Sequence, residues 1–79
     1  RSYYVRMNVM DKPGVLAKIA AAFGKYDVSI NSVEQIASQG SANIIFMIHM
    51  TQESFINKAI KDIKSLSEVL AVNSIIRVI

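Results

Sequence analysis

The spacing of apolar residues alternates between two periods along this chain of 79 residues, and the order of these periods is compatible with few folds. Period two is typical of a strand and occurs in four segments, whereas a period near 3.6, typical of an amphipathic helix, occurs in two. The order is strand, helix, strand, strand, helix, strand. With right-handed crossovers it predicts an α+β protein with the ferredoxin-like βαββαβ fold, a four-stranded antiparallel sheet with two helices on one face.

The predicted strands cover residues 3–10, 28–35, 42–50 and 69–79. The third is apolar on both sides, which is typical of a central strand, and the second has a largely polar edge. The alternation assigns the residues of each strand to two faces. In the first strand the faces are Tyr3, Val5, Met7, Val9 and Tyr4, Arg6, Asn8, Met10, and in the second they are Val28, Ile30, Ser32, Glu34 and Ser29, Asn31, Val33, Gln35. In the third strand they are Ile44, Phe46, Ile48 and Ile45, Met47, His49, and in the fourth they are Val72, Ile76, Val78 and Asn73, Ile75, Arg77.

The predicted helices run from Pro13 to Lys25 and from Thr51, as a possible cap, to about Ser65. Asp11 is the expected cap or near-cap of the first helix, whose end is marked by Gly24 and the residues after it. Lys58 and Asp62 have the spacing of an exposed ion pair on one helix. The inward residues are Leu16, Ile19, Ala20 and Phe23 in the first helix and Ile56, Ala59, Ile60 and Ile63 in the second.

The stretch from Asp11 to Leu16 reads Asp-Lys-Pro-Gly-Val-Leu and connects the first strand to the first helix, after which the second strand is expected to return beside the first. Pro13 suits the first helical turn, and Gly14 allows another group to approach the backbone closely. The free N–H groups of such a helix N-terminus suit a carboxylate or phosphate. A strand-to-helix turn without a ligand explains the same residues, and turns of this kind are commoner than sites.

The composition predicts one domain, 1–79, that meets a partner. Its hydrophobic content of 52% is high for a small monomer, and we expect self-association through an outer sheet face containing Val33, Ile45, Met47 and Ile75. The absence of cysteine excludes disulfides and thiolate metal sites. No apolar run reaches the roughly 18 residues of a membrane span, so we expect a cytoplasmic protein without membrane contact. A chain that begins at Arg1 suggests a piece of a longer protein.

The net charge of +3 is distributed over the chain rather than concentrated in one basic block. Lysines occupy the polar sides of both predicted helices, and Arg6 and Arg77 lie in strands. This distribution is typical of solvated helix faces, and we expect no nucleic-acid partner.

A fold shared by many proteins does not define a function, so each alternative needs its own residues. An RNA-recognition domain needs aromatic residues on the open sheet face, but residues 41–46 offer only Phe46, which is expected to face the core. A heavy-metal-binding domain needs Cys-x-x-Cys, and an acyl-phosphate hydrolase needs an arginine where this loop has only Lys12. His49 has no second histidine or cluster of carboxylates, and Ser29 has no adjacent base. We therefore assign no catalytic residue, no metal ligand and no cofactor to this domain.

The Asp-Lys-Pro-Gly-Val-Leu loop, followed by a helix that ends near Phe23, resembles the ACT domain family, whose first loop commonly reads Asp/Asn-x-Pro-Gly-Val-Leu. The resemblance covers essentially the whole chain and agrees with the βαββαβ order. It implies a regulatory module that binds a small effector, usually an amino acid, beside the catalytic domain of a parent enzyme. It also implies a homodimer formed by side-by-side sheet pairing, with the effector between the first loop of one copy and the second strand of its neighbour.

The resemblance also implies particular effector-binding residues. Members that bind amino acids often read Gly-Val-Asn-Ile on the second strand, whereas this chain reads Asp-Val-Ser-Ile-Asn over residues 27–31, with its asparagine displaced by two positions. The run over residues 28–35 looks like the C-terminal ACT domain of bacterial homoserine dehydrogenases. That likeness implies threonine as the effector, feedback inhibition, and NAD(P) in the parent chain only. The expected effector-binding residues are Asp11, Lys12, Pro13, Gly14, Val15, Leu16, Ser29 and Asn31.

Two further possibilities remain open at this point. The domain can be an oligomerisation module that has lost its ligand and acts by sheet pairing alone. It can also regulate another enzyme of amino-acid biosynthesis, of the branched-chain or serine pathways. The polar second-strand edge and Asp11 favour an effector-binding domain.

Overall fold

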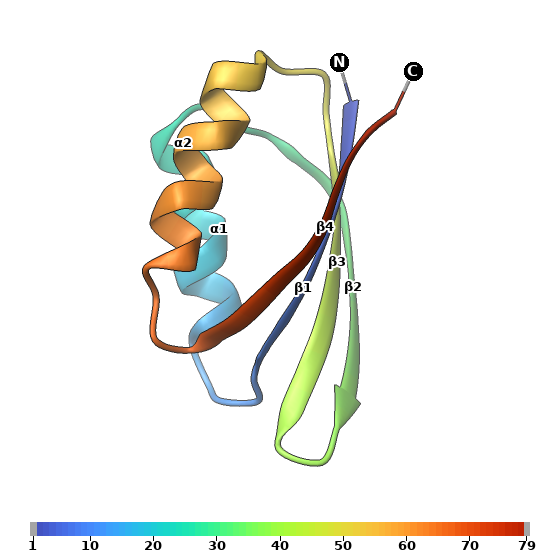
Figure 1. The fold of residues 1–79 in the computed structure, drawn as a ribbon, viewed down its shortest axis with the longest axis vertical. Helices are drawn as coiled ribbons and strands as arrows, with labels where there is room; N and C mark the ends of the chain where they lie inside the picture. The colour runs from blue at the N-terminus through green and yellow to red at the C-terminus, as the bar shows by residue number, and fades with distance from the viewer. Residues whose placement is uncertain (1, 79) are drawn as a thin grey trace.

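A computed structural model describes residues 2–78 and has the predicted order of strands and helices. Its four strands form one antiparallel sheet in the order β2-β3-β1-β4, and both helices cover the same face of this sheet (Figure 1). This arrangement confirms the ferredoxin-like α+β fold. The elements are β1 (Ser2–Met10), α1 (Val15–Lys25), β2 (Ile30–Ser38), β3 (Ser41–Ile48), α2 (Glu53–Lys64) and β4 (Val69–Val78).

The second strand does not return beside the first, contrary to the expectation from the sequence. A turn at Gln39 and Gly40 joins β2 directly to β3, so these two strands pair as a hairpin and β3 takes the place beside β1. The sheet therefore has β2 and β4 as its edges. The prediction of a central third strand is confirmed.

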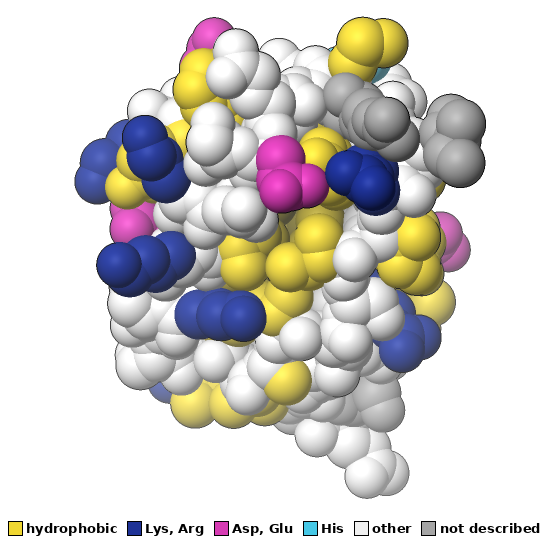
Figure 2. All heavy atoms as spheres, turned by 45° about the horizontal axis from the view of Figure 1, so that its top comes forward, with side chains coloured by type: hydrophobic (Ala, Val, Ile, Leu, Met, Phe, Trp, Pro, Cys, Tyr) yellow, Lys and Arg dark blue, Asp and Glu magenta, His cyan; other side chains and the backbone are white. Residues whose placement is uncertain are grey.

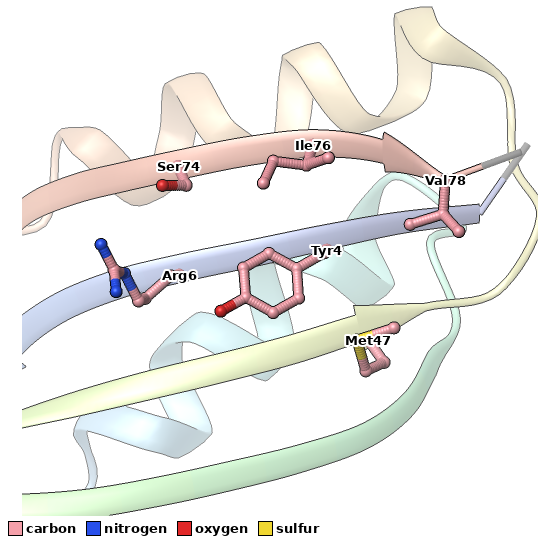
Figure 3. Close-up of a pocket in the computed structure, with 6 residues that line it drawn as sticks. All are labelled: Tyr4, Arg6, Met47, Ser74, Ile76 and Val78. Atoms are coloured by element: carbon pink, nitrogen blue, oxygen red, sulfur yellow. The ribbon is translucent and has the colours of Figure 1, made fainter.

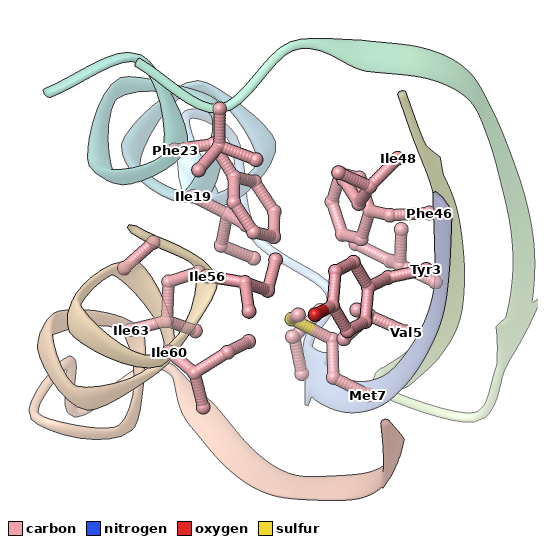
Figure 4. Packing of buried hydrophobic residues seen from close by; sticks show 14 of the residues in the cluster. Tyr3, Val5, Met7, Ile19, Phe23, Phe46, Ile48, Ile56, Ile60 and Ile63 are labelled. Carbon is pink, nitrogen blue, oxygen red and sulfur yellow. The ribbon is translucent and has the colours of Figure 1, made fainter. Parts of the chain in front are cut away.

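The hydrophobic core lies between the sheet and the helices (Figure 4). Phe23 of α1 and Phe46 of β3 are fully buried, and their rings meet edge to face with centroids 5.3 Å apart. The residues of α2 that were predicted to face inward are all buried, and so is Phe46, which was expected to face the core. In β1 and β3 one of the two predicted faces is buried as a whole. The buried residues of these three elements are Tyr3, Val5, Met7, Val9, Ala42, Ile44, Phe46, Ile48, Ile56, Ala59, Ile60 and Ile63.

The first helix begins two residues later than predicted. Gly14, with a φ of 85°, is the residue before the helix, and Pro13 lies in the preceding turn. Because the helix is entered through a left-handed residue, Val15 faces the core and Leu16 is 38% exposed, the reverse of the expectation for Leu16. No side chain caps this N-terminus, so the prediction that Asp11 is the cap is wrong.

α1 ends at Lys25, as predicted, and of the residues expected to mark this end Asp27 is the left-handed one, whereas Gly24 lies inside the helix. The backbone N–H of Asp27 donates to the carbonyl of Gly24, and that of Val28 donates to the carbonyl of Phe23. These two bonds define a Schellman motif, in which the residue after the C-cap is left-handed. Asp27 has a φ of 59°, and the residue that follows it, Val28, is buried, an apolar contact that frequently accompanies this motif.

Irregularities in β2 and β4 change which side chains face the helices. The register shifts between Ile30 and Ser32 of β2, and again where β4 pairs with Arg6 and Met7, so that Asn31 and Asn73 are extra residues in the ladder. After such a bulge the alternation of faces is inverted. Val33 and Ile75 consequently pair with the core residues Phe46 and Val5 and lie on the helix side, and the expectation that they lie on the outer face is wrong.

The second helix begins after Gln52 rather than Thr51, and no side chain caps it. Asp62 does not form the predicted pair with Lys58; its carboxylate accepts hydrogen bonds from Lys25 and Tyr26 at the end of α1. Within residues 2–78 there is no helix with the length and apolar character needed to cross a bilayer.

Candidate functional site

The first loop is held against the turn between β2 and β3. The backbone N–H of Asp11 donates to the carbonyl of Gly40 at 3.1 Å, and the N–H of Lys12 donates to the carbonyl of Met10 at 3.0 Å. Both loops lie at the same end of the sheet (Figure 1). The backbone of Asp11 is therefore fixed by the hairpin, a contact that sequence analysis did not identify, although the Gln-Gly pair signals the turn itself.

The start of α1 carries backbone donors without acceptors. Within the part of the chain that the structure describes, the N–H groups of Gly14, Leu16 and Ala17 have no acceptor, whereas that of Val15 donates to the carbonyl of Lys12 at 3.4 Å. A Cβ added at Gly14 would meet nothing within 4 Å, so the space beside this residue is open. A helix N-terminus with free donors and open space beside it suits an anionic group.

The side chains of the loop differ in what they can offer a ligand. Asp11, Lys12 and Pro13 are exposed, and neither Asp11 nor Lys12 forms an ion pair among the described residues. The side chain of Val15 is buried in the core, so this residue can contribute only its backbone to a site. Leu16, being partly exposed, can offer apolar contact beside the free N–H groups.

The predicted second-strand residues lie at the other end of the sheet. Ile30 pairs with Ile48, which also pairs with Tyr3 at the start of β1, whereas Asp11 follows the end of β1. β2 runs from the end with Ser29 and Asn31 to the end with the first loop (Figure 1). The structure therefore brings Ser29 and Asn31 together, both exposed, but separates them from Asp11 by the length of a strand, roughly 25 Å for nine residues.

Ser29 does not belong to β2, which begins at Ile30. Its carbonyl accepts a hydrogen bond from the backbone N–H of His49 at 3.0 Å, and its side chain is exposed. His49 is exposed, and residues 2–78 contain no group of three potential metal ligands.

The groups with shifted pKa values join secondary-structure elements. One of them, Glu68, lies beside the start of the first loop, because its carbonyl accepts a hydrogen bond from the backbone N–H of Met10. The hydrogen bond from Lys18 of α1, together with that from its own backbone, lowers the pKa of Glu68 in the loop before β4. The hydrogen bond from the Tyr26 hydroxyl lowers the pKa of Asp62, and the contact with Asp62 raises that of Lys25. These shifts indicate structural contacts between elements rather than a catalytic centre.

A shallow hollow of about 460 Å³ lies on the sheet face opposite the helices (Figure 3). Its polar side is formed by Arg6, Ser74 and the hydroxyl end of Tyr4, and the rest is apolar. The sequence pattern missed this hollow because the bulge at Asn73 moves Ser74, Ile76 and Val78 to the outer face. Figure 2 shows Lys and Arg side chains spread mainly over the helical side, with hydrophobic side chains between them.

The ferredoxin-like fold and the Asp-Lys-Pro-Gly-Val-Leu loop together are typical of one family of small domains, and the comparison with known proteins agrees. Residues 3–68 match the family model of the ACT domain. The chain therefore belongs to the ACT domain family.

The chain is similar to segments of several homoserine dehydrogenases. The enzyme from Mycobacterium tuberculosis is 38% identical over 81 residues, which cover 95% of this chain and 18% of the relative. The enzyme from Helicobacter pylori is 35% identical over 78 residues, which cover 96% of this chain and 18% of that enzyme. The crystal structure of a homoserine dehydrogenase from Thiobacillus denitrificans superposes with a TM-score of 0.87 at 33% identity, over 96% of this chain and 17% of that one. The chain thus spans less than a fifth of the length of these proteins.

Proposed function

We propose that this ACT domain binds a free amino acid, L-threonine, and regulates a homoserine dehydrogenase of which it is part. The observation that carries the proposal is the row of unpaired N–H groups at Gly14, Leu16 and Ala17, beside open space at the start of α1. The relatives in homoserine dehydrogenases point to the parent enzyme. Threonine is the leading effector because it is the end product of the pathway that such an enzyme serves.

In this proposal the loop holds the carboxylate of the amino acid. The N–H groups at the N-terminus of α1 provide donors and partial positive charge, both of which favour an anion. The exposed carboxylate of Asp11 suits the ammonium group, since it has no ion-pair partner among the described residues. The small polar groups of Ser29 and Asn31 suit a hydroxyl.

These residues can meet only between two copies of the chain, because one copy holds Asp11 and Asn31 at opposite ends of its sheet. β2 is an edge strand, and a two-fold axis beside it would pair two β2 strands in antiparallel fashion into one continuous sheet. Antiparallel pairing sets the start of one β2 beside the end of the other. The end of β2 adjoins Gly40, which is bonded to Asp11, so Asn31 of one copy approaches the first loop of the second.

Feedback inhibition further requires threonine to bind one state of the parent enzyme better than another, and a typical coupling free energy is about 1–3 kcal/mol. The catalytic domain, with NAD(P) as its cofactor, would supply the oxidoreductase activity, and this cytoplasmic domain would supply the control.

Two alternatives predict different results. A purely structural ACT module would pair through β2 and bind no amino acid, and a module of a branched-chain or serine pathway would select another effector.

Titration calorimetry of this chain with threonine, valine, serine and isoleucine tests the proposal. Valine is nearly isosteric with threonine but lacks the hydroxyl, and a site that hydrogen-bonds this group rejects the analogue strongly. We therefore expect threonine to bind, with valine at least about tenfold weaker. Equal affinities for the two would remove the hydroxyl recognition. Preference for serine, isoleucine or valine would assign another pathway, and no heat from any of the four would favour the structural module.

A further inference from the structure

The sheet face opposite the helices carries two opposite charges in one row. Arg6 of β1 and Glu34 of β2 both pair with Ile45 of β3, which lies between them. Directly paired residues of neighbouring strands share a face, and Arg6 alternates with the buried Val5 and Met7, so all three side chains of the row lie on the outer face. The two charges are therefore separated by two strand spacings, about 10 Å.

Neither charge has an ion-pair partner in the part of the chain that the structure describes. The ion pairs among residues 2–78 involve Lys18 with Glu68, Lys25 with Asp62, and Arg77 with Glu53, and none includes Arg6 or Glu34.

Around this row the outer face carries exposed apolar side chains, interspersed with the small polar residues Ser32, Ser74, Asn8 and Asn43. Ile76 is 53% exposed and Ile36 is 54% exposed, and neither belongs to the core. Figure 3 shows Tyr4, Met47 and Ile76 on the same face as Arg6, with the helices behind the sheet. A face of this kind favours a partner that covers apolar side chains and offers one anion and one cation.

We propose that the occupant of this face is a second copy of the chain, packed sheet against sheet about a two-fold axis that runs along β3 above Ile45. β1 and β2 flank β3 at equal spacing, so this axis exchanges their positions. Arg6 of each copy then faces Glu34 of the other, and one interface contains two equivalent ion pairs. The same chain supplies both charges, which makes the face complementary to itself.

The apolar residues fit the same arrangement. Ile45 and Met47 meet their own equivalents at the axis, and Tyr4 faces Ser32, which pairs with Met47 in the next strand. Packed sheets lie about 10 Å apart, a distance that an arginine and a glutamate together can bridge. β4 of each copy extends past β2 of the other, over the position where a side-by-side neighbour would continue the sheet. This contact uses the sheet face and is independent of effector binding at the β2 edge.

Mixing two charge-reversal variants tests this interface. Arg6→Glu places two acidic residues in the row, and Glu34→Arg places two basic ones, so each variant repels its own copies. A mixed pair, however, restores both opposite-charge contacts. We expect each variant alone to show a dimer dissociation constant through this face about tenfold or more above that of the unchanged chain. An equimolar mixture should form mixed dimers with an affinity within about threefold of the original.

Sedimentation equilibrium with one variant fluorescently labelled measures these constants, and far-UV circular dichroism checks that each variant is folded. Lys58→Glu, on the exposed side of α2, makes the same change in charge as Arg6→Glu and should leave association unchanged. Pairing through the β2 edge leaves the interior strand β1 untouched and cannot produce the recovery on mixing. A mixture that associates no better than its components, or a clean monomer of the unchanged chain at about 100 μM, would overturn the proposal.

Discussion

The hydroxyl of Tyr26, directly after α1, donates a hydrogen bond to a carboxylate oxygen of Asp62 in α2, with the two oxygens 2.8 Å apart. Lys25 reaches the same carboxylate oxygen at 3.4 Å. Because Tyr26 and then Lys25 favour the ionised carboxylate, the pKa of Asp62 lies below its ordinary value, although burial opposes the shift. The contact joins the end of α1 to α2.

This contact predicts how stability depends on acid. A carboxyl with a lowered pKa in the folded state contributes stability above its unfolded pKa, near 3.8, and the contribution is lost as the pH falls through the folded value. We expect Asp62→Asn to lower the melting temperature at pH 7 and to make its decline below pH 4 shallower. Thermal melts at a series of pH values measure this. Glu53→Gln is the control, and an unchanged slope in Asp62→Asn would show that the contact contributes nothing.

Asp27 provides a second prediction, about the end of α1. Its φ of 59° lies in the left-handed region, which a residue with a Cβ occupies at a cost that glycine avoids. We expect Asp27→Gly to stabilise the fold by about 0.5–1 kcal/mol and Asp27→Ala to destabilise it. Urea unfolding of both variants measures the two changes. The idea fails if glycine destabilises the fold as much as alanine does.

The sequence was sufficient for the strands and helices because their buried faces are long and regular. Tyr3 to Val9 and Ile44 to Ile48 alternate without interruption, and the structure buries the predicted side chains of both. The bulges at Asn31 and Asn73 were not predictable, because a bulge shifts the phase of the alternation and apolar residues on both faces, such as Ile75 and Ile76, conceal the shift. For this reason the sequence pattern placed Ile75 on the outer face, although it lies on the helix side. It also did not place Ile76 on the outer face, where the structure has it.

For the candidate site, the sequence identified the loop but not its geometry. The Pro-Gly pair predicted a turn into a helix, yet only the structure shows that Gly14 is left-handed and that α1 starts after it. The separation of Asp11 from Asn31 follows from the strand directions, because β1 and β2 run parallel and the end of one lies at the opposite end of the sheet from the start of the other. Local patterns contain no information on contacts between chains, so the proposal that a second copy completes the site rests on the family resemblance.

The shifted start of α1 predicts unequal effects at two adjacent residues. Val15 is buried, whereas Leu16 is 38% exposed, although leucine is the larger side chain. We expect Val15→Ala to destabilise the fold by about 1.5–2 kcal/mol and Leu16→Ala by less than about 1 kcal/mol, since alanine also favours the helix. Chemical denaturation of the pair measures the difference. The opposite order would support a helix that begins at Pro13.

Substitutions of Gly14 can distinguish its role in the turn before α1 from its proposed role in ligand binding. Alanine at a φ of 85° is strained by about 1–2 kcal/mol, whereas asparagine tolerates this conformation better. The added Cβ has open space within the chain, so in either variant it occupies the volume proposed for the carboxylate. We expect Gly14→Asn to remain folded and to lose threonine binding at least about tenfold. Calorimetry with a melting curve on the same sample measures both, and unchanged affinity would mean that this glycine serves only the turn.

A site shared between two copies predicts recovery of binding when two defective chains are mixed. Asp11→Ala removes the group proposed for the ammonium, and Asn31→Ala removes a polar group of the second strand, so each variant alone has two damaged sites in its dimer. In a mixed dimer both changes fall in one site, because the loop of one copy faces β2 of the other. The second site then combines the unchanged loop of one chain with the unchanged strand of its partner.

We expect each variant alone to bind threonine at least about tenfold more weakly, and the mixed dimer to bind one threonine with the original affinity. Purification of the mixed dimer with two different affinity tags, followed by calorimetry, gives the number of sites directly. If the mixed dimer binds no better than its components, Asp11 and Asn31 do not act on one ligand across the interface.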